Sequence, residues 1–183
     1  MRRILWAALA VLLSASACLA QDASSGATAA TRSLSPADML KRTHDQTDAM
    51  AARLAKDGGP SEDWLLLARS YLQFREFDKA KDAARQAISR KPKDIEARMV
   101  LAEAQIAGTS HAGRLPDDFV ATMREVLDID PTNGSSLYYV GLAESEAGHS
   151  SQARELWGKL LASLPADDPR RVDLNKRLEA LPQ

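Results

Sequence analysis

Large apolar residues and small residues recur along residues 61–94 at spacings that place them on one side of two successive helices. The inward positions of this segment are Trp64, Leu67, Ala68, Tyr71, Ala80, Ala84, Ala87 and Pro92. Separations of three and four residues return a side chain to the same face of an α-helix, and the final proline ends the second helix. Because small residues let two helices approach closely, the pattern predicts a helical hairpin.

The same kinds of residue return in residues 134–167, with a glycine at the turn between the two predicted helices. The positions are Leu137, Val140, Gly141, Glu144, Gly148, Ala153, Trp157, Leu160 and Pro165. A hairpin that recurs with a period of about 34 residues is the signature of a tetratricopeptide repeat. One such hairpin cannot bury its own apolar face, so the sequence predicts a stack of hairpins with a concave groove.

Residues 95–133 follow this pattern only if an insertion separates the two helices of the hairpin. The first helix is in register at Ile95, Arg98, Leu101, Ala102 and Gln105, and the second places Phe119, Met123, Val126 and Pro131 five residues late. The glycines and polar residues of segment 108–114 predict a loop, and Pro116 with Asp117 then starts the second helix. Phe119 stands where the other hairpins have alanine, so we expect this hairpin to be splayed.

A further helix is predicted on either side of the three hairpins. Residues 35–58 begin with the capping residues Ser35 and Pro36 and end at two glycines and a proline, with Met39, Met50 and Leu54 as an apolar stripe. Residues 168–181 place Val172, Leu174, Leu178 and Leu181 toward the last hairpin and Arg170, Arg171, Lys176 and Arg177 toward water. The predicted fold class is all-α: a tetratricopeptide-repeat superhelix of three helical hairpins, 61–94, 95–133 and 134–167, with N-terminal and C-terminal capping helices.

Residues 1–20 have the pattern of a secretory signal peptide. Arg2 and Arg3 precede an apolar run over residues 4–13, and small residues follow as far as Ala20. This run is too short to span a bilayer comfortably, so we predict cleavage after Ala20 and a flexible linker over residues 21–34. In the alternative, Ala15-Ser16-Ala17-Cys18 resembles a bacterial lipobox, and Cys18 carries a lipid anchor. Both readings predict an exported, periplasmic protein.

The charge balance and the scattered histidines argue against several classes of function. The chain has 24 basic and 25 acidic residues, and loss of Arg2 and Arg3 changes the net charge from −1 to −3, so no basic excess would attract nucleic acid. His44, His111 and His149 lie far apart in sequence, and no cysteine or acidic cluster accompanies them at metal-ligand spacing. We expect no enzyme activity, no catalytic residues, no metal and no cofactor. His111, in the inserted loop, remains a functional candidate.

In stacked hairpins the first helix of each pair lines the groove, and this places a set of candidate protein-binding residues. They are Leu65, Arg69, Leu72, Met99, Glu103, Ile106, Tyr138 and Leu142. An apolar strip bordered by a few charges suits the apolar face of an amphipathic helix, with Met99 and Tyr138 as adaptable anchors. The alternative is that Leu65, Met99 and Leu142 belong to the core between repeats.

Residues 39–181 resemble the periplasmic domain of the CcmI/CycH-type and NrfG-type cytochrome c biogenesis proteins. The resemblance rests on segments 64–71, 113–116, 126–131, 139–143 and 156–161, in this order and with the split second repeat. It implies a chaperone-like adaptor that holds apocytochrome c, largely by its C-terminal helix, and presents it to the haem-ligation machinery.

One departure from the CcmI/CycH type concerns the N-terminus. That type carries its repeats behind two membrane-spanning helices, whereas this chain begins with a signal-like segment, which brings its layout closer to the NrfG-like proteins. A general envelope scaffold for the assembly of another complex is therefore the alternative function. Since the sequence contains no Cys-x-x-Cys-His motif, we expect no haem on the chain itself.

Overall fold

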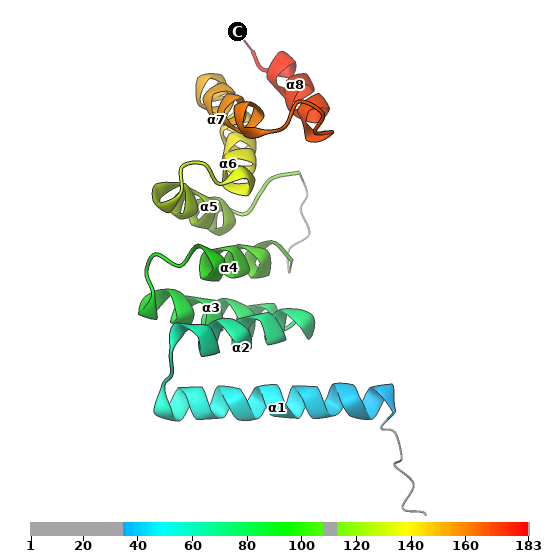
Figure 1. The fold of residues 1–183 in the computed structure, drawn as a ribbon, viewed down its shortest axis with the longest axis vertical. Coiled ribbons are helices and arrows are strands. Elements are labelled where there is room, and N and C mark those ends of the chain that lie inside the picture. Colours follow the sequence, from blue (N-terminus) through cyan, green and yellow to red (C-terminus); the bar gives the residue numbers. More distant parts are fainter. Residues whose placement is uncertain (1–34, 108–112, 183) are drawn as a thin grey trace, which may run out of the picture.

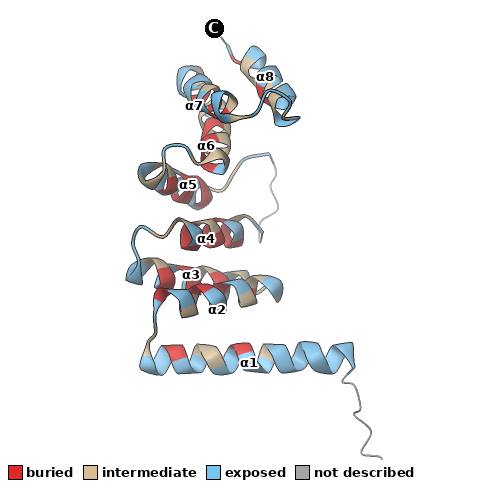
Figure 2. Cartoon of the chain, in the orientation of Figure 1, coloured by how far each residue is buried: buried red, intermediate tan, exposed pale blue. Residues whose placement is uncertain are grey.

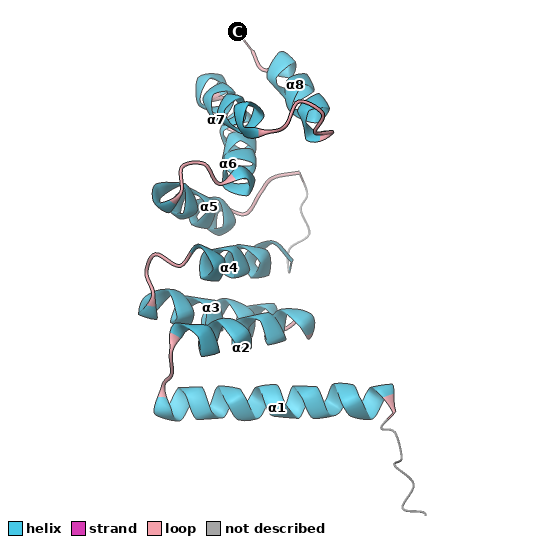
Figure 3. Ribbon diagram, viewed as in Figure 1, coloured by secondary structure: helices cyan, strands magenta, loops and turns pink. Residues whose placement is uncertain are grey.

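The computed structural model describes residues 35–107 and 113–182, and these residues form eight α-helices and no β-strand (Figures 1 and 3). The helices are α1 (Pro36–Asp57), α2 (Ser61–Gln73), α3 (Phe77–Arg90), α4 (Ile95–Ala107), α5 (Asp117–Ile129), α6 (Gly134–Glu146), α7 (Ser150–Ser163) and α8 (Arg170–Ala180). They stack into an elongated molecule with α1 at one end and α8 at the other (Figure 1). The predicted all-α tetratricopeptide fold is confirmed. The predicted signal peptide, the linker and His111 lie outside the described residues.

Consecutive helices pair as three hairpins, α2 with α3, α4 with α5, and α6 with α7. The hairpins follow one another in a continuous stack because α3 packs on α4 and α5 packs on α6, while α2 also touches α4. Helices α4 and α5 approach each other less closely than the helices of the other two hairpins. This agrees with the splay that is expected from Phe119 at a position where the other hairpins have alanine.

Local capping explains where several helices begin and end. The Ser35 side chain accepts a hydrogen bond of 3.1 Å from the Asp38 backbone N–H at the start of α1, and the Asn133 side chain accepts one of 3.0 Å from the Ser136 N–H at the start of α6. The turn of the third hairpin contains Gly148 with a φ of 80°. The corresponding residue of the first hairpin is Arg75, which adopts a φ of 60° without the freedom of glycine.

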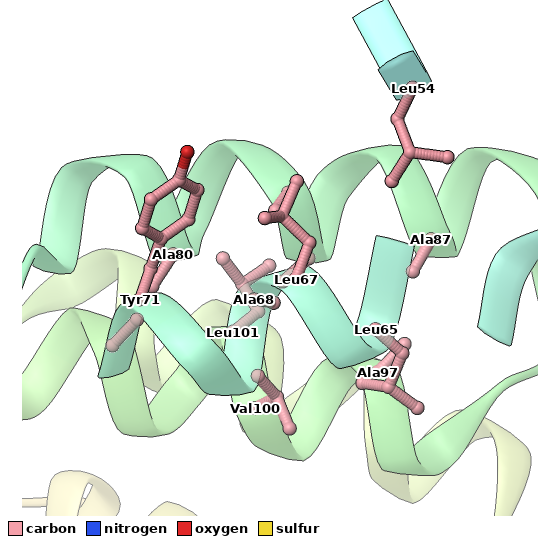
Figure 4. Packing of buried hydrophobic residues seen from close by; sticks show 13 residues of the cluster. Leu54, Leu65, Leu67, Ala68, Tyr71, Ala80, Ala87, Ala97, Val100 and Leu101 are labelled. Atoms are coloured by element: carbon pink, nitrogen blue, oxygen red, sulfur yellow. The ribbon is translucent and has the colours of Figure 1, made fainter. Parts of the chain in front are cut away.

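Alanines make the first hairpin compact. Ala68 of α2 and Ala80, Ala84 and Ala87 of α3 have no exposed surface. Figure 4 shows Leu54 of α1 pointing toward this hairpin, where it joins the same buried cluster. Small side chains let the backbones of the two helices approach, and dense packing of this kind stabilises the pair through many dispersion contacts.

The buried residues of the two capping helices differ in part from those predicted. Helix α1 is mostly exposed (Figure 2), with Thr47 and Leu54 as its buried residues, and the predicted stripe residue Met39 is 50% exposed. Leu174 of α8 and Leu181, which directly follows α8, are buried, whereas Val172 is 74% exposed. The prediction for Val172 was wrong because Leu174, Leu178 and Leu181 follow the spacing of one helical face and Val172 does not.

Two of the arginines predicted to face water contact the protein instead. The Arg171 guanidinium donates hydrogen bonds of 2.7 and 2.9 Å to the carbonyl oxygens of Leu161 and Leu164. These carbonyls lie at the end of α7, where helical partners are missing, so Arg171 fastens α8 to α7. The Arg177 guanidinium lies 5.5 Å from the centroid of the Tyr138 ring.

None of the helices over residues 35–107 and 113–182 is long and apolar enough to cross a membrane.

Candidate functional site: an apolar cavity in the groove

A cavity of about 430 Å³ opens between the first helices of the three hairpins and reaches down to the second helix of the middle one. Its lining residues are Arg69 of α2; Glu96, Met99, Val100, Ala102, Glu103 and Ile106 of α4; Phe119 and Met123 of α5; and Ser135 and Tyr139 of α6. The deeper part of the lining is apolar and the charged residues are exposed. The cavity therefore offers a place for an apolar group beside a few charges.

Half of the predicted binding residues line this cavity. They are Arg69, Met99, Glu103 and Ile106. Leu65 does not: it is 7% exposed and belongs to the buried cluster that joins α2, α3 and α4. For Leu65 the structure supports the alternative of an inter-repeat core residue. Leu72 is partly buried against the same cluster.

The third hairpin contributes Tyr139 rather than the predicted Tyr138. The Tyr139 ring meets the Phe119 ring edge-on with centroids 5.0 Å apart, whereas Tyr138 and Leu142 pack on the cluster formed by α6, α7 and α8. Neighbouring residues on an α-helix point about 100° apart, so rotation of the helix by a fraction of a turn exchanges which tyrosine faces the groove.

Phe119 and Met123 form the floor of the cavity, and the sequence did not assign them to the site. Both are buried, and the Ser136 hydroxyl lies 3.5 Å from the Met123 sulfur. They reach the groove because α4 and α5 are splayed. The signal in the sequence was the large side chain of Phe119 at a position where the other hairpins have Ala80 and Ala153.

The rim of the cavity carries one unbalanced negative charge. The Arg69 guanidinium forms an ion pair with the Glu96 carboxylate across α2 and α4. Glu103 is exposed and has no ion-pair partner among the residues that the structure describes. An exposed ion pair such as Arg69–Glu96 contributes little to stability, so its main effect is to neutralise one end of the groove.

A second cavity, of about 350 Å³, lies at the start of α3 and has a different character. Its lining includes Glu76 paired with Lys79 at 2.7 Å and Asp78 paired with Lys81 at 2.7 Å. Hydrogen bonds from these lysines lower the pKa of both carboxyls. The two pairs neutralise these four side chains, and the remaining charged lining residue, Arg75, has its guanidinium 5.6 Å from the centroid of the Phe77 ring.

The two histidines within the described part of the chain each face a carboxylate. His44 Nε2 lies 2.7 Å from Glu76 Oε1, which raises the pKa of His44, and His149 Nδ1 lies 2.7 Å from Glu144 Oε2. Neither belongs to a group of three or more potential metal ligands within residues 35–107 and 113–182. Both contacts are hydrogen bonds between a histidine ring and a carboxylate of the same chain.

Comparisons with known proteins agree with this architecture. The family model of the cytochrome c-type biogenesis protein H TPR domain matches residues 27–171. No curated protein is significantly similar to the chain in sequence. Two crystal structures of MamA align with it: one at 18% identity and a TM-score of 0.50, covering 67% of this chain and 66% of that one, and another at 17% identity and a TM-score of 0.53, covering 80% and 92%.

A further alignment is with TTC0263, a thermophilic TPR protein in Thermus thermophilus, at 19% identity and a TM-score of 0.48 over 76% of this chain and 74% of that one. The MamA alignments show a shared fold, and their low identities say nothing about a shared partner.

Proposed function

The chain belongs to the family of cytochrome c-type biogenesis protein H TPR domains, and on this premise we propose that its groove captures an amphipathic helix of apocytochrome c and holds it for haem attachment. The family name supports a role in cytochrome c biogenesis. The groove supports the proposal that the protein performs this role by binding a segment of another protein.

The observation that carries the proposal is the apolar cavity framed by α2, α4, α5 and α6. Met99 and Ile106 are partly exposed and present flexible or branched apolar side chains to a partner, above the buried Met123 on the floor, and methionine adapts its shape to different apolar surfaces. A helix laid in such a groove presents apolar residues at every third or fourth position. Micromolar affinity, on the order of −8 kcal/mol, is the expected strength once ordering costs are subtracted.

We propose that the protein acts by binding alone, as an adaptor to the haem-ligation machinery. This proposal rests on the sequence, which places no nucleophile, base or metal-ligand set at workable spacing. Metal analysis and haem spectra of the purified protein test it. Stoichiometric metal or haem would contradict the proposal.

The site of action that we propose is the periplasm, on the basis of the signal-like residues 1–20. Mass spectrometry of the chain from an envelope fraction should find an N-terminus at Gln21. A lipid on Cys18, abolished in Cys18→Ser, would select the lipoprotein alternative. A chain that keeps Met1 in the cytoplasmic fraction would contradict export.

Calorimetric titration tests the function itself. The titrant is a peptide with the sequence of the C-terminal helix of an apocytochrome c from the same organism, and the control is a scrambled peptide of equal composition. Binding of the native peptide at micromolar concentration, with the scrambled one at least tenfold weaker, is the expected result. Equal affinities would favour the alternative of a general envelope scaffold.

A further inference from the structure

We infer that the groove selects its partner helix by one aromatic side chain, inserted between α4 and α6 onto Phe119 and Met123, and by a lysine or arginine one helical turn away that pairs with Glu103. This inference rests on the proposed function and adds to it the chemistry of the segment that is bound. It follows from the shape of the cavity, the nature of its walls and the charges on its rim.

The size of the cavity allows side chains to enter but not a whole helix. A helix with its side chains is about 10 Å across and rises about 5.4 Å per turn, so a helix of two or three turns needs far more room than the cavity volume of about 430 Å³. The partner helix therefore lies along the rim, on the exposed faces of α2, α4 and α6. One side chain reaches the floor that α5 provides.

The walls of the cavity favour an aromatic group. Phe119 and Tyr139 already meet edge to face, and the partly exposed Tyr139 ring can extend this contact to an aromatic ring that enters the cavity. Met99 and Met123 line the same space, and a methionine sulfur in contact with an aromatic ring is favourable. A leucine would fill the space without gaining these contacts.

The charges on the rim indicate which kind of residue should stand near that aromatic residue on the partner helix. Met99, Glu103 and Ile106 follow one another on the same face of α4 at spacings of four and three residues. Glu103 thus stands between two apolar lining residues with its carboxylate unpaired within the described part of the chain. A cation three or four positions from the aromatic residue on the partner helix would meet this carboxylate.

The same charges disfavour an acidic partner. The one cation of the lining, Arg69, is engaged with Glu96, so an incoming carboxylate would meet Glu103 without a free positive charge to balance it. Like charges brought together at an interface reduce affinity and suppress the wrong partners. The groove should therefore discriminate against acidic helices of equal hydrophobicity.

The experiment uses the mature chain and the native apocytochrome peptide with a set of single replacements. Replacing one aromatic residue of the peptide by alanine should weaken binding tenfold or more, while replacing the others should change it less than threefold. Glu103→Lys should weaken the native peptide about tenfold, and a peptide whose adjacent lysine is changed to glutamate should recover affinity for Glu103→Lys. Recovery of this kind shows direct pairing.

The matched control is Glu179→Lys, which makes the same charge change on the exposed face of α8, away from the groove. It should leave the affinity for every peptide unchanged. Because Glu103 and Glu179 are both exposed, both variants should melt at the temperature of the parent chain.

The possible outcomes distinguish failure of this inference from failure of the proposed function on which it rests. If the native and scrambled peptides bind alike or not at all, the proposed function fails. If the native peptide binds selectively but no aromatic replacement matters, or Glu103→Lys has no more effect than Glu179→Lys, the function stands and the inference is overturned.

Discussion

The indole ring of Trp157 in α7 packs against Gly141 in α6 so closely that a Cβ atom on Gly141 would lie 2.5 Å from Trp157 Nε1. The same Nε1 donates a hydrogen bond of 3.1 Å to the carbonyl oxygen of Tyr138. At the equivalent positions the first hairpin has Ala68 and Ala84. The third hairpin thus pairs a glycine with a large ring at the place where the first hairpin pairs two alanines.

We predict that Gly141→Ala destabilises the protein by about 1–3 kcal/mol, because the added methyl overpacks a buried site and pushes the indole from its hydrogen bond. Urea unfolding followed by tryptophan fluorescence measures the effect. Gly158→Ala is the matched control, since a Cβ there meets nothing within 4 Å, and alanine in a helix should stabilise by about 0.5–1 kcal/mol. Equal effects of the two substitutions would contradict the packing described here.

The turn of the first hairpin should gain stability from a glycine. Arg75 has a φ of 60°, a conformation that costs a residue with a side chain about 1–2 kcal/mol. Relief of this strain exceeds the added flexibility of glycine in the unfolded chain by a few tenths of a kcal/mol to about 1 kcal/mol. Arg75→Gly should therefore raise the unfolding midpoint in urea. Gly148→Ala, at the corresponding turn with a φ of 80°, should lower it.

The contact between α1 and the first hairpin should depend on pH through His44. His44 donates to Glu76, lies 3.3 Å from Asp48 and stacks edge-on to Phe74, while Lys79 pairs with Glu76. The pKa of His44 is raised above 6.5, mainly by the hydrogen bond to Glu76. A raised histidine pKa contributes stability that is complete below pH 6.5 and is lost as the pH rises through the raised value.

Glu76 limits the same contact on the acid side. Its pKa is lowered below 4.5, first by Lys79 and then by His44, so its contribution is complete above pH 4.5 and is lost as the pH falls through the lowered value. NMR titration of the His44 ring should give a pKa above 6.5 that falls in Glu76→Gln. An unchanged His44 titration in that variant would show that the contact does not form in solution.

The architecture could be predicted from the sequence because it depends on side-chain volume at fixed spacing. Ala68, Ala84, Gly141 and Trp157 mark helix pairs by size alone. The late position of Phe119 indicated the insertion, and its large side chain indicated the splay. Such signals are local: each requires only that two helices lie at contact distance.

The binding surface was harder to predict because it depends on how each helix is rotated within the stack. Leu65 turned inward to the core and Tyr139 replaced Tyr138 in the groove, and both changes follow from rotations of a fraction of a turn. The floor residue Met123 became part of the site only through the separation of α4 from α5. The repeat template alone does not give that separation, and the large side chain of Phe119 was its signal in the sequence.

The central claim is that a partner helix lies over the cavity between α4, α5 and α6, and the methionine methyl groups report on it directly. Met99 and Met123 line the cavity, whereas Met39 and Met50 lie on α1. In a chain with labelled methionine methyls, addition of the apocytochrome peptide should shift the Met99 and Met123 signals and leave those of Met39 and Met50 unchanged. Binding of the peptide that shifts only the α1 methionines, or none of the four, would contradict the account.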